Sequence, residues 1–375
     1  MAVTRAAAPE VLFVTGEASG DLHAGPVAAA LAAARPDVRL TAIGGDALRA
    51  AGAEVFVDCR ALSAMGFVEV IGAIPRHWQL LTALERRFAE GRTRLVVCVD
   101  YPGFNLRVAA AARRAGIPVL YYITPQVWAW RRSRLTTMAR VITKAAVILP
   151  FEAPLLTAAG IDATFVGHPL AEHADTLPTR AAARASLGIG ADARVLALFP
   201  GSRAGEIARH WAPMREAAAI LQRDDPTLEV FVAGAPGRAL PATDLPVVTG
   251  ASGAVYRAAD AALSKSGTNT LEAALAGCPL VVGYRANPLS FALAKRLVTL
   301  THVSLVNIVA GREVVPELLQ DAMTGARLAA AVRPLLDASS PVRAAQVTAL
   351  RDVAALLGAG GAAERVAAMA DALLG

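Results

Sequence analysis

The stretch that most constrains this chain runs from Ser264 to Arg285 and reads SKSGTNTLEAALAGCPLVVGYR. An apolar run at 261–263 leads into small polar residues and Gly267, and apolar residues at helical spacing follow. This order predicts a strand, a tight turn and a helix, with Gly267 letting a ligand approach the backbone. The amides and positive dipole of a helix N-terminus suit a diphosphate, but an ordinary capped helix explains these residues equally well.

Polar side chains in and after this turn are candidate ligand contacts. Glu272, about one turn into the predicted helix, is placed to accept hydrogen bonds from ribose hydroxyls. Lys265 adds a positive charge that either contacts the diphosphate or is merely exposed. The candidate nucleotide-contacting residues of this stretch are Lys265, Ser266, Gly267, Thr268 and Glu272.

A chain of 375 residues exceeds what one hydrophobic core usually supports, so we expect two domains. The composition becomes polar and loop-like from Asp175 to Arg194, before a second α/β run begins. We expect a Rossmann-like N-terminal domain at 1–170, a Rossmann-like C-terminal domain at 171–343 and a helical segment at 344–375. That last segment is expected to pack on the N-terminal domain or on a partner subunit.

Composition narrows the class of protein. The mean hydropathy of +0.45 comes largely from alanine in helical segments, and no charge-free run of about 20 apolar residues predicts a transmembrane helix. Arg5 and Glu10 bracket too short an apolar stretch for a signal peptide. Cys59, Cys98 and Cys278 form no CxxC pattern and are expected to be reduced core residues of a cytoplasmic protein. The net charge of +6 favours an anionic partner without choosing among nucleic acid, phospholipid and sugar nucleotide.

Polar residues follow the predicted strands of the first half, where open α/β sheets place ligands. GEASGDLHAG follows a strand at 11–15 and precedes a helix expected from near Pro26, and its spacing is not the GxGxxG of dinucleotide cofactors. Asp100 ends a strand at 95–99, where it is placed to accept a proton, although an Asx-type turn cap is the structural alternative. Further candidates to line a cleft are Ser19, Gly20, Asp21, His23, Asn105 and Trp128.

Two other classes of site find little support. TPQVWAWRRSRL interleaves two tryptophans with arginines, but one aromatic pair beside one arginine cluster is weak evidence for RNA, and we expect no nucleic-acid partner. The six histidines fit no zinc spacing, and no Asp-x-Asp pair stands ready for a divalent ion, so we expect no metal site.

The segment at 61–81, ALSAMGFVEVIGAIPRHWQLL, is unusually apolar for a surface. Its glycines and proline rule out one clean amphipathic helix. The residues alone favour a core-packing loop and helix over a surface that faces lipid. Those that would face lipid are Met65, Phe67, Val68, Ile71 and Trp78.

The second half repeats a glycine and serine pair after a strand. PGSRAGEI follows the predicted strand at 195–199, so Gly201 and Ser202 lie at its carboxyl end and Arg203 is placed to reach a phosphate. Arg203 as a plain surface residue is the structural alternative. Asn307 belongs to a polar run near the proposed nucleotide loop, although a capped helix explains much of that run.

An ordered set of motifs spans nearly the whole chain. GEASGDLHAG, MGFVEVIG, VDYPGFN, TPQVWAW, LPFE, FVGHPL, LFPGSRAGEI, SGTNTLEAAL, CPLVVGYR and NIVAGRE occur in this order. No single block is decisive, but together they closely resemble the lipid-A-disaccharide synthase family of membrane-associated glycosyltransferases. Lys265 and Asn269 depart from the family pattern, as does Gln126, where serine is usual.

The resemblance implies a GT-B fold, with two Rossmann-like domains whose parallel sheets face an interdomain cleft, and an inverting transfer without metal or other cofactor. The implied donor is UDP-2,3-diacylglucosamine and the implied acceptor is 2,3-diacylglucosamine 1-phosphate. The products would be the β-1,6-linked disaccharide 1-phosphate and UDP. The implied location is the cytoplasmic face of the inner membrane, bound peripherally to surface phospholipid as a monomer or homodimer.

The resemblance also implies residue roles. Asp100 matches the candidate general base for the acceptor 6-hydroxyl. Arg203 and Asn307 match positions implicated in catalysis or UDP binding, and the SGTNTLE block with Glu272 matches the nucleotide-contacting loop. Because diacylated substrates need an apolar docking surface, the apolar residues of 61–81 become candidates to touch acyl chains or membrane.

Two other functions remain open. A UDP-sugar 2-epimerase on the same fold would convert a soluble UDP-sugar with no acceptor present and would not need the apolar 61–81 surface. A non-enzymatic nucleotide-binding protein would keep its biological function when Asp100 is replaced by asparagine.

Overall fold

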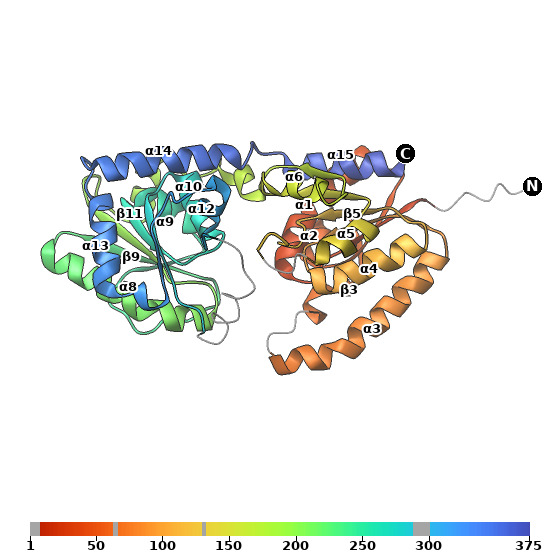
Figure 1. The fold of residues 1–375 in the computed structure, drawn as a ribbon, viewed down its shortest axis with the longest axis horizontal. Coiled ribbons are helices and arrows are strands. Elements are labelled where there is room, and N and C mark those ends of the chain that lie inside the picture. The colour runs from red at the N-terminus through yellow and green to blue at the C-terminus, as the bar shows by residue number, and fades with distance from the viewer. Residues whose placement is uncertain (1–7, 63–66, 130–132, 288–300) are drawn as a thin grey trace, which may run out of the picture. The chain divides into compact units, whose positions relative to one another are not determined.

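The computed structural model describes residues 8–62, 67–129, 133–287 and 301–375, with side chains left out at 67–75 and at 173. The chain divides into two compact units (Figure 1). Unit 1 comprises Met1–Pro169 together with Ala359–Gly375, and unit 2 comprises Leu170–Gly358.

Unit 1 is built on a parallel sheet with the strand order β3-β2-β1-β4-β5-β6-β7. The strands are β1 Glu10–Val14, β2 Arg39–Gly44, β3 Glu54–Asp58, β4 Thr93–Val99, β5 Val119–Tyr122, β6 Lys144–Val147 and β7 Ala163–Phe165. The helices are α1 Ala18–Ala34, α2 Asp46–Ala50, α3 Phe67–Ala89, α4 Pro102–Arg114, α5 Arg134–Val141, α6 Glu152–Thr157 and α15 Ala362–Leu374.

Both faces of this sheet are buried, which is why its strands are continuous apolar runs. Val11 and Phe13 of β1 point to the face covered by α1 and α15, while Leu12 and Val14 point to the face covered by α3, α4 and α5. The period of two in a strand therefore divides each run between two helical layers.

Unit 2 repeats this arrangement with the strand order β10-β9-β8-β11-β12-β13, again parallel. The strands are β8 Val195–Phe199, β9 Glu229–Gly234, β10 Val247–Thr249, β11 Ala261–Ser264, β12 Leu280–Tyr284 and β13 Glu317–Leu319. The helices are α7 Arg180–Ser186, α8 Ala204–Asp224, α9 Ser252–Ala258, α10 Asn269–Ala276, α12 Leu305–Ala310, α13 Gly325–Leu336 and α14 Pro341–Leu356. Helices α8 and α13 cover one face of the sheet with the apolar core of this unit.

The structure divides the segment expected at 344–375 between the two units. Helix α14 packs on α10, α12 and α13 of unit 2, and the Gln346 side chain accepts a hydrogen bond from the Leu280 amide at 2.7 Å. Helix α15 packs on α1 of unit 1, where Arg365 donates to the Val166 carbonyl at 2.9 Å. The expected boundary at 170/171 lies one residue from the division after Pro169.

The predicted α/β class with two parallel sheets is confirmed. Sequence reasoning missed β3 and β13, whose residues are mostly half-buried at sheet edges and lack a continuous apolar run. The helix expected from near Pro26 begins instead at Ala18, with exposed Pro26 inside it. Ser19, Gly20 and Asp21 thus belong to the first turn of α1 rather than to a loop.

Asp21, expected to line a cleft, is engaged within the fold. Its buried carboxylate accepts hydrogen bonds from the amides of Gly45, Ala47 and Leu48, at 2.6, 2.9 and 3.3 Å. These amides begin α2 and have no partner of their own within that helix, so Asp21 supplies the missing acceptor from α1. The side chain stabilises the fold of unit 1, and its expected place in a cleft stays a prediction.

We predict that Asp21→Ala lowers the free energy of unfolding by about 1–3 kcal/mol, because it leaves buried amides without an acceptor. Urea unfolding followed by circular dichroism measures this change. Asp46→Ala is the matched control, since the exposed Asp46 forms surface ion pairs with Arg49 at 2.8 Å and with Arg60 at 3.7 Å, and the loss of such exposed pairs should cost less than about 1 kcal/mol. Equal stability of the two variants would mean that the Asp21 carboxylate is not needed for the fold, and would favour its role as a ligand contact.

Candidate functional site

In unit 2 a cavity of about 270 Å³ opens at the carboxyl ends of the strands. It lies where the strand order reverses between β8 and β11, the position at which open α/β sheets bind ligands. Its polar lining comes from the turns after β8 and β9 and from the starts of α9 and α10, with Gly201, Ser202, Gly234, Ser252, Asn269 and Glu272.

Gly201 begins the turn between β8 and α8 with a φ of +135°. A Cβ added to it would lie 2.7 Å from Cβ of Glu206, so only glycine fits this turn. The Ser202 amide donates to Oε2 of the buried Glu206 at 3.2 Å. A carboxylate of the chain itself therefore accepts from the Ser202 amide, in the turn where the sequence predicts that Arg203 reaches a phosphate.

Two cations flank this carboxylate. Nζ of Lys265 lies 3.8 Å from Oε2 of Glu206, and Nη1 of Arg203 lies 3.7 Å from Oε1. Burial lowers the pKa of Lys265, and Glu206 opposes that shift. The Arg203 side chain is 83% exposed, which leaves it room to turn toward a ligand. Gly267 lies beside them with a φ of +128°, and an added Cβ there would meet Nζ of Lys265 at 2.9 Å.

The remaining nucleotide candidates differ in what they contact. Oε2 of Glu272 accepts from Oγ of Ser252 at 2.6 Å at the wall of the cavity. Ser266 is buried and donates to the Val303 carbonyl at 2.7 Å, so its hydroxyl supports the loop. Thr268 is exposed at the N-cap of α10 and makes no side-chain cap. Ser252 was missed because a lone serine carries no pattern.

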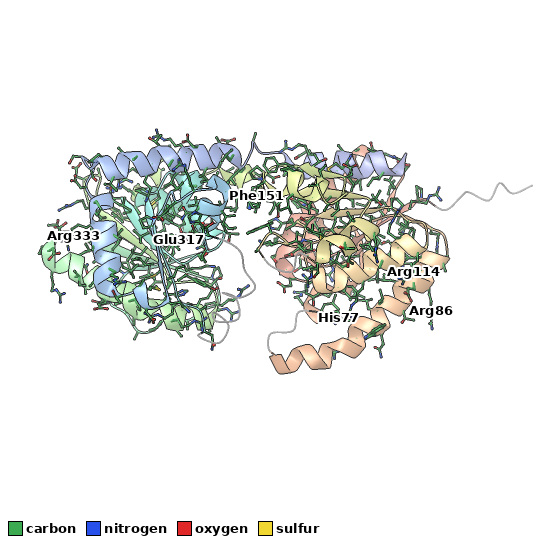
Figure 2. The ribbon with its side chains drawn as sticks, viewed as in Figure 1. His77, Arg86, Arg114, Phe151, Glu317 and Arg333 are labelled. Atoms are coloured by element: carbon green, nitrogen blue, oxygen red, sulfur yellow. The ribbon has the colours of Figure 1, made fainter. Side chains whose placement is uncertain are left out.

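Asn307, expected to act in catalysis or UDP binding, is engaged within the fold. Its side chain is 0% exposed. Oδ1 accepts from the amides of Val314 and Val315, and Nδ2 donates to the Val315 carbonyl and to Oε1 of Glu317. Glu317, labelled in Figure 2, also accepts from Ser304, so these residues fix the loops around α12. These contacts give Asn307 a structural role, and its expected part in catalysis or UDP binding stays a prediction.

In unit 1 the residues after β4 form a strained turn. Among the described residues, four non-glycine residues have a left-handed φ, and Asp100 at +50°, Tyr101 at +48° and Ile123 at +59° follow the adjacent strands β4 and β5. This conformation costs of order 1–3 kcal/mol per residue and persists only where its surroundings enforce it. The Asp100 carbonyl is held by Tyr121 Oη at 2.7 Å and by Asn105 Nδ2 at 2.8 Å.

Contacts around Tyr101 fix the same turn. Its hydroxyl donates to the Leu62 carbonyl at 3.1 Å, and His77 Nε2 lies 3.2 Å from that hydroxyl. Gly16 packs against the ring so closely that an added Cβ would lie 2.0 Å from it. The β1–α1 turn and the Asp100 turn are therefore side by side at the carboxyl edge of the sheet.

The Asp100 carboxyl is the main titratable candidate of this edge. Burial raises its pKa, and a hydrogen bond from the Tyr101 amide partly opposes the shift. A raised pKa suits a carboxylate that must accept a proton near neutral pH. Burial also lowers the pKa of His168 to about 4, with a smaller contribution from His23, so His168 is neutral near pH 7.

Other cleft candidates of unit 1 are engaged within the fold. Trp128 is buried, donates to Oε1 of Glu152 at 2.9 Å and meets the Phe151 ring edge-to-face at 5.2 Å. Burial raises the pKa of Glu152 to about 6. Asn105 is buried and donates to three carbonyls, including that of Asp100. Ser19 stays exposed, and Gly20 is buried near the end of β4.

The lipid-facing candidates are only partly described. Met65 lies outside the described residues, as do the side chains of Phe67, Val68 and Ile71. The last three belong to α3, which continues through the glycine and proline that were expected to interrupt a helix here. Trp78 on the same helix is 57% exposed, with the Arg107 guanidinium 5.8 Å from its ring centre. No helix in the described part of the chain combines the length and apolar character needed to cross a membrane.

Within the described ranges, no three His, Cys, Asp or Glu side chains gather as metal ligands would. The expectation of a transfer without metal stays a prediction, as does the expectation that the two sheets face one cleft.

Solved structures of low identity share this fold. The glycotransferase of kitacinnamycin matches with a TM-score of 0.63 at 19% identity, over 98% of this chain and 100% of that chain. A putative UDP-N-acetylglucosamine 2-epimerase from Listeria monocytogenes matches with a TM-score of 0.63 at 13% identity, over 95% and 94% of the two chains. At such identities the likeness shows the fold alone.

Sequence comparison is more specific. The family model described as lipid-A-disaccharide synthetase matches residues 11–369. A lipid-A-disaccharide synthase of Anaeromyxobacter sp. (strain K) is 43% identical over 96% of both chains. The synthase of Geobacter metallireducens is 40% identical over 97% of both. This chain belongs to the lipid-A-disaccharide synthetase family, and it is a glycosyltransferase enzyme of lipid A biosynthesis.

Proposed function

We propose that this enzyme transfers 2,3-diacylglucosamine from UDP to the 6-hydroxyl of 2,3-diacylglucosamine 1-phosphate, with inversion at the anomeric carbon. The observation that carries the proposal is the Asp100 turn, in which left-handed backbone and fixed contacts hold a partly buried carboxyl at the carboxyl edge of the unit 1 sheet. Family membership supports the choice of sugar substrates.

Asp100 is the proposed general base. Its carboxylate accepts the proton of the acceptor 6-hydroxyl while that oxygen forms a bond to the anomeric carbon of the donor. The bond from the anomeric carbon to the diphosphate oxygen breaks, and UDP leaves with the electron pair. Positioned acid–base groups of this kind contribute about 10²–10⁴-fold to rate.

The turns of unit 2 are proposed to bind the leaving UDP. Amides at Ser202 and at the start of α10 donate to the diphosphate, and the charges of Lys265 and Arg203 compensate its negative charge. Glu206 accepts from the Ser202 amide in this structure, so the diphosphate competes with that carboxylate for the amide. Glu272 is proposed to accept hydrogen bonds from the ribose hydroxyls.

The apolar residues on α3 are proposed to meet acyl chains or the surface of the inner membrane. Exposed Trp78 is the described member of this group. Its indole ring is large and apolar with one polar atom, which suits the boundary between lipid and water. The cytoplasmic face of the inner membrane remains the proposed location.

Asp100→Asn tests the base. We expect kcat to fall about 10²–10⁴-fold with the dissociation constant of UDP unchanged, since asparagine keeps the shape but cannot take the proton. Release of UDP from the two acylated sugars measures the rate, and calorimetric titration measures binding. Wild-type turnover by this variant would remove Asp100 from the reaction.

The dependence on pH gives a second test of Asp100. Only the deprotonated carboxylate accepts a proton, and burial raises the pKa of Asp100. We therefore expect kcat/KM to fall as pH decreases, with a midpoint above the value of about 3.9 of an exposed aspartate. Residual turnover of Asp100→Asn should lack this acid limb. If the variant shows the same fall in kcat/KM at low pH, a group other than Asp100 causes that fall. UDP binding measured at each pH checks that the protein stays folded.

Glu272→Gln tests the ribose contact. Hydrogen bonds to a charged group contribute about 1.5–3 kcal/mol, so UDP should bind about 10–100-fold more weakly. UDP lacking both ribose hydroxyls should bind the wild type and the variant equally, because it has no hydroxyl for Glu272 to hold. Calorimetric titration of both ligands into the wild type and into the variant measures these four affinities. An equal loss for both would mean that the substitution disturbs the cavity instead.

A reaction without an acceptor would favour the epimerase. If the protein converts a soluble UDP-sugar when no acylated acceptor is present, the transferase proposal fails. UDP release that requires both acylated sugars, and that Arg203→Ala strongly reduces, supports it.

A further inference from the structure

Unit 2 contains a second cavity, of about 790 Å³, at the opposite edge of its sheet. Its lining includes Asp260, which immediately precedes β11, and Gly277, which shortly precedes β12. Gly201 and Gly267 instead follow β8 and β11. The second cavity is thus formed at the amino ends of the strands, apart from the proposed donor cavity.

Helices from distant parts of the chain supply four arginines to this cavity. Arg180 comes from α7, Arg257 from α9, and Arg343 and Arg351 from α14. Helix α14 packs on α10 within this unit (Figure 1). Asp260 is the one carboxylate among the described residues that line it. The lining therefore carries a surplus of positive charge.

The Asp260 carboxylate already has several partners within the protein. It pairs with Arg180 at 2.6 Å and with buried Arg184 at 3.0 Å, and it accepts from the Val195 amide at 2.9 Å. Arg343 Nη2 lies 4.0 Å away. One carboxylate shared in this way leaves no negative charge for the other guanidinium groups of the cavity.

Two of the arginines keep free donors. Arg257 Nη1 donates to the Ala276 carbonyl at 3.1 Å, but its buried Nε has no hydrogen-bond partner among the described residues. Leaving a buried donor without a partner costs about 1–3 kcal/mol, so this part of the lining is not satisfied by the chain's own acceptors. Arg351 is exposed, and within the described ranges no carboxylate lies within 4.0 Å of it.

We propose that this cavity binds a phosphate-bearing anion. A phosphate monoester or diphosphate presents several acceptor oxygens and about two negative charges, which matches planar guanidinium donors and their surplus charge better than a single carboxylate does. The volume exceeds that of bare phosphate, and Leu275 and Val347 add apolar wall, so an organic phosphate fits. This proposal holds whether or not the enzyme uses the sugar substrates proposed above.

The phosphate can belong to a free molecule or to the headgroup of an anionic phospholipid, and two probes separate these sources. Calorimetric titration of inorganic pyrophosphate, with saturating UDP present to occupy the donor cavity, tests the free anion. Sedimentation with phosphatidylglycerol vesicles, against phosphatidylcholine vesicles, tests the headgroup.

The test variant is Arg257→Gln with Arg351→Gln, and Arg351→Gln alone serves if the pair unfolds. Arg333→Gln is the matched control, because Arg333 lies on α13, pairs with Asp224 and does not line the cavity (Figure 2). All variants should bind UDP as the wild type does, which shows that unit 2 is folded.

We expect the test variant to bind pyrophosphate, or the anionic vesicles, at least tenfold more weakly than the wild type and the Arg333 control. If the test variant loses only pyrophosphate binding, the ligand is a free phosphate compound. If it loses vesicle binding, the ligand is a lipid headgroup. No binding of either probe to the wild type, or equal binding by the test variant and the wild type, would overturn the proposal.

Discussion

Both sheets of this protein depend on one topological constraint. In each unit the chain builds strands outward from the first strand and then crosses back to continue on its other side. No helix connection covers the carboxyl edge where the direction reverses, between β1 and β4 in unit 1 and between β8 and β11 in unit 2. Asp100 in unit 1 and the glycine turns in unit 2 lie at these two edges.

Polar residues at these edges divide into two kinds. Asn105 and Asn307 are fully buried and form hydrogen bonds mainly with backbone groups, so they fix the turns. Asp100 and Arg203 keep their charged groups at least partly accessible, with the turns around them already formed. Fixing the backbone in advance lowers the cost of orienting substrate. Catalytic chemistry in this account is assigned to the second kind.

The sequence was sufficient for the architecture because apolar runs of four to seven residues, ending in glycine or a polar residue, identify buried parallel strands. It located the turns after β4, β8 and β11 for the same reason. It failed for β3 and β13, which are half-buried strands at sheet edges.

Side-chain roles were harder to predict than elements. A polar residue after a strand looks the same in sequence whether it faces a ligand or a neighbouring amide, and only contacts across the fold separate the two. Asp21 bonds to amides 24 to 27 residues away. Glu206 reads as a helix cap, yet it also lies between Lys265 and Arg203. The large amino-edge cavity escaped notice because its arginines come from three separate helices.

The most direct test of the central claim is hydrogen–deuterium exchange of the backbone amides, with and without UDP. If the open carboxyl edge of unit 2 binds the diphosphate, exchange should slow at 201–203 and 266–270 and stay unchanged at 257–260 and 276–278. Slower exchange confined to the second pair of segments, or no change in any of them at saturating UDP, would contradict the account.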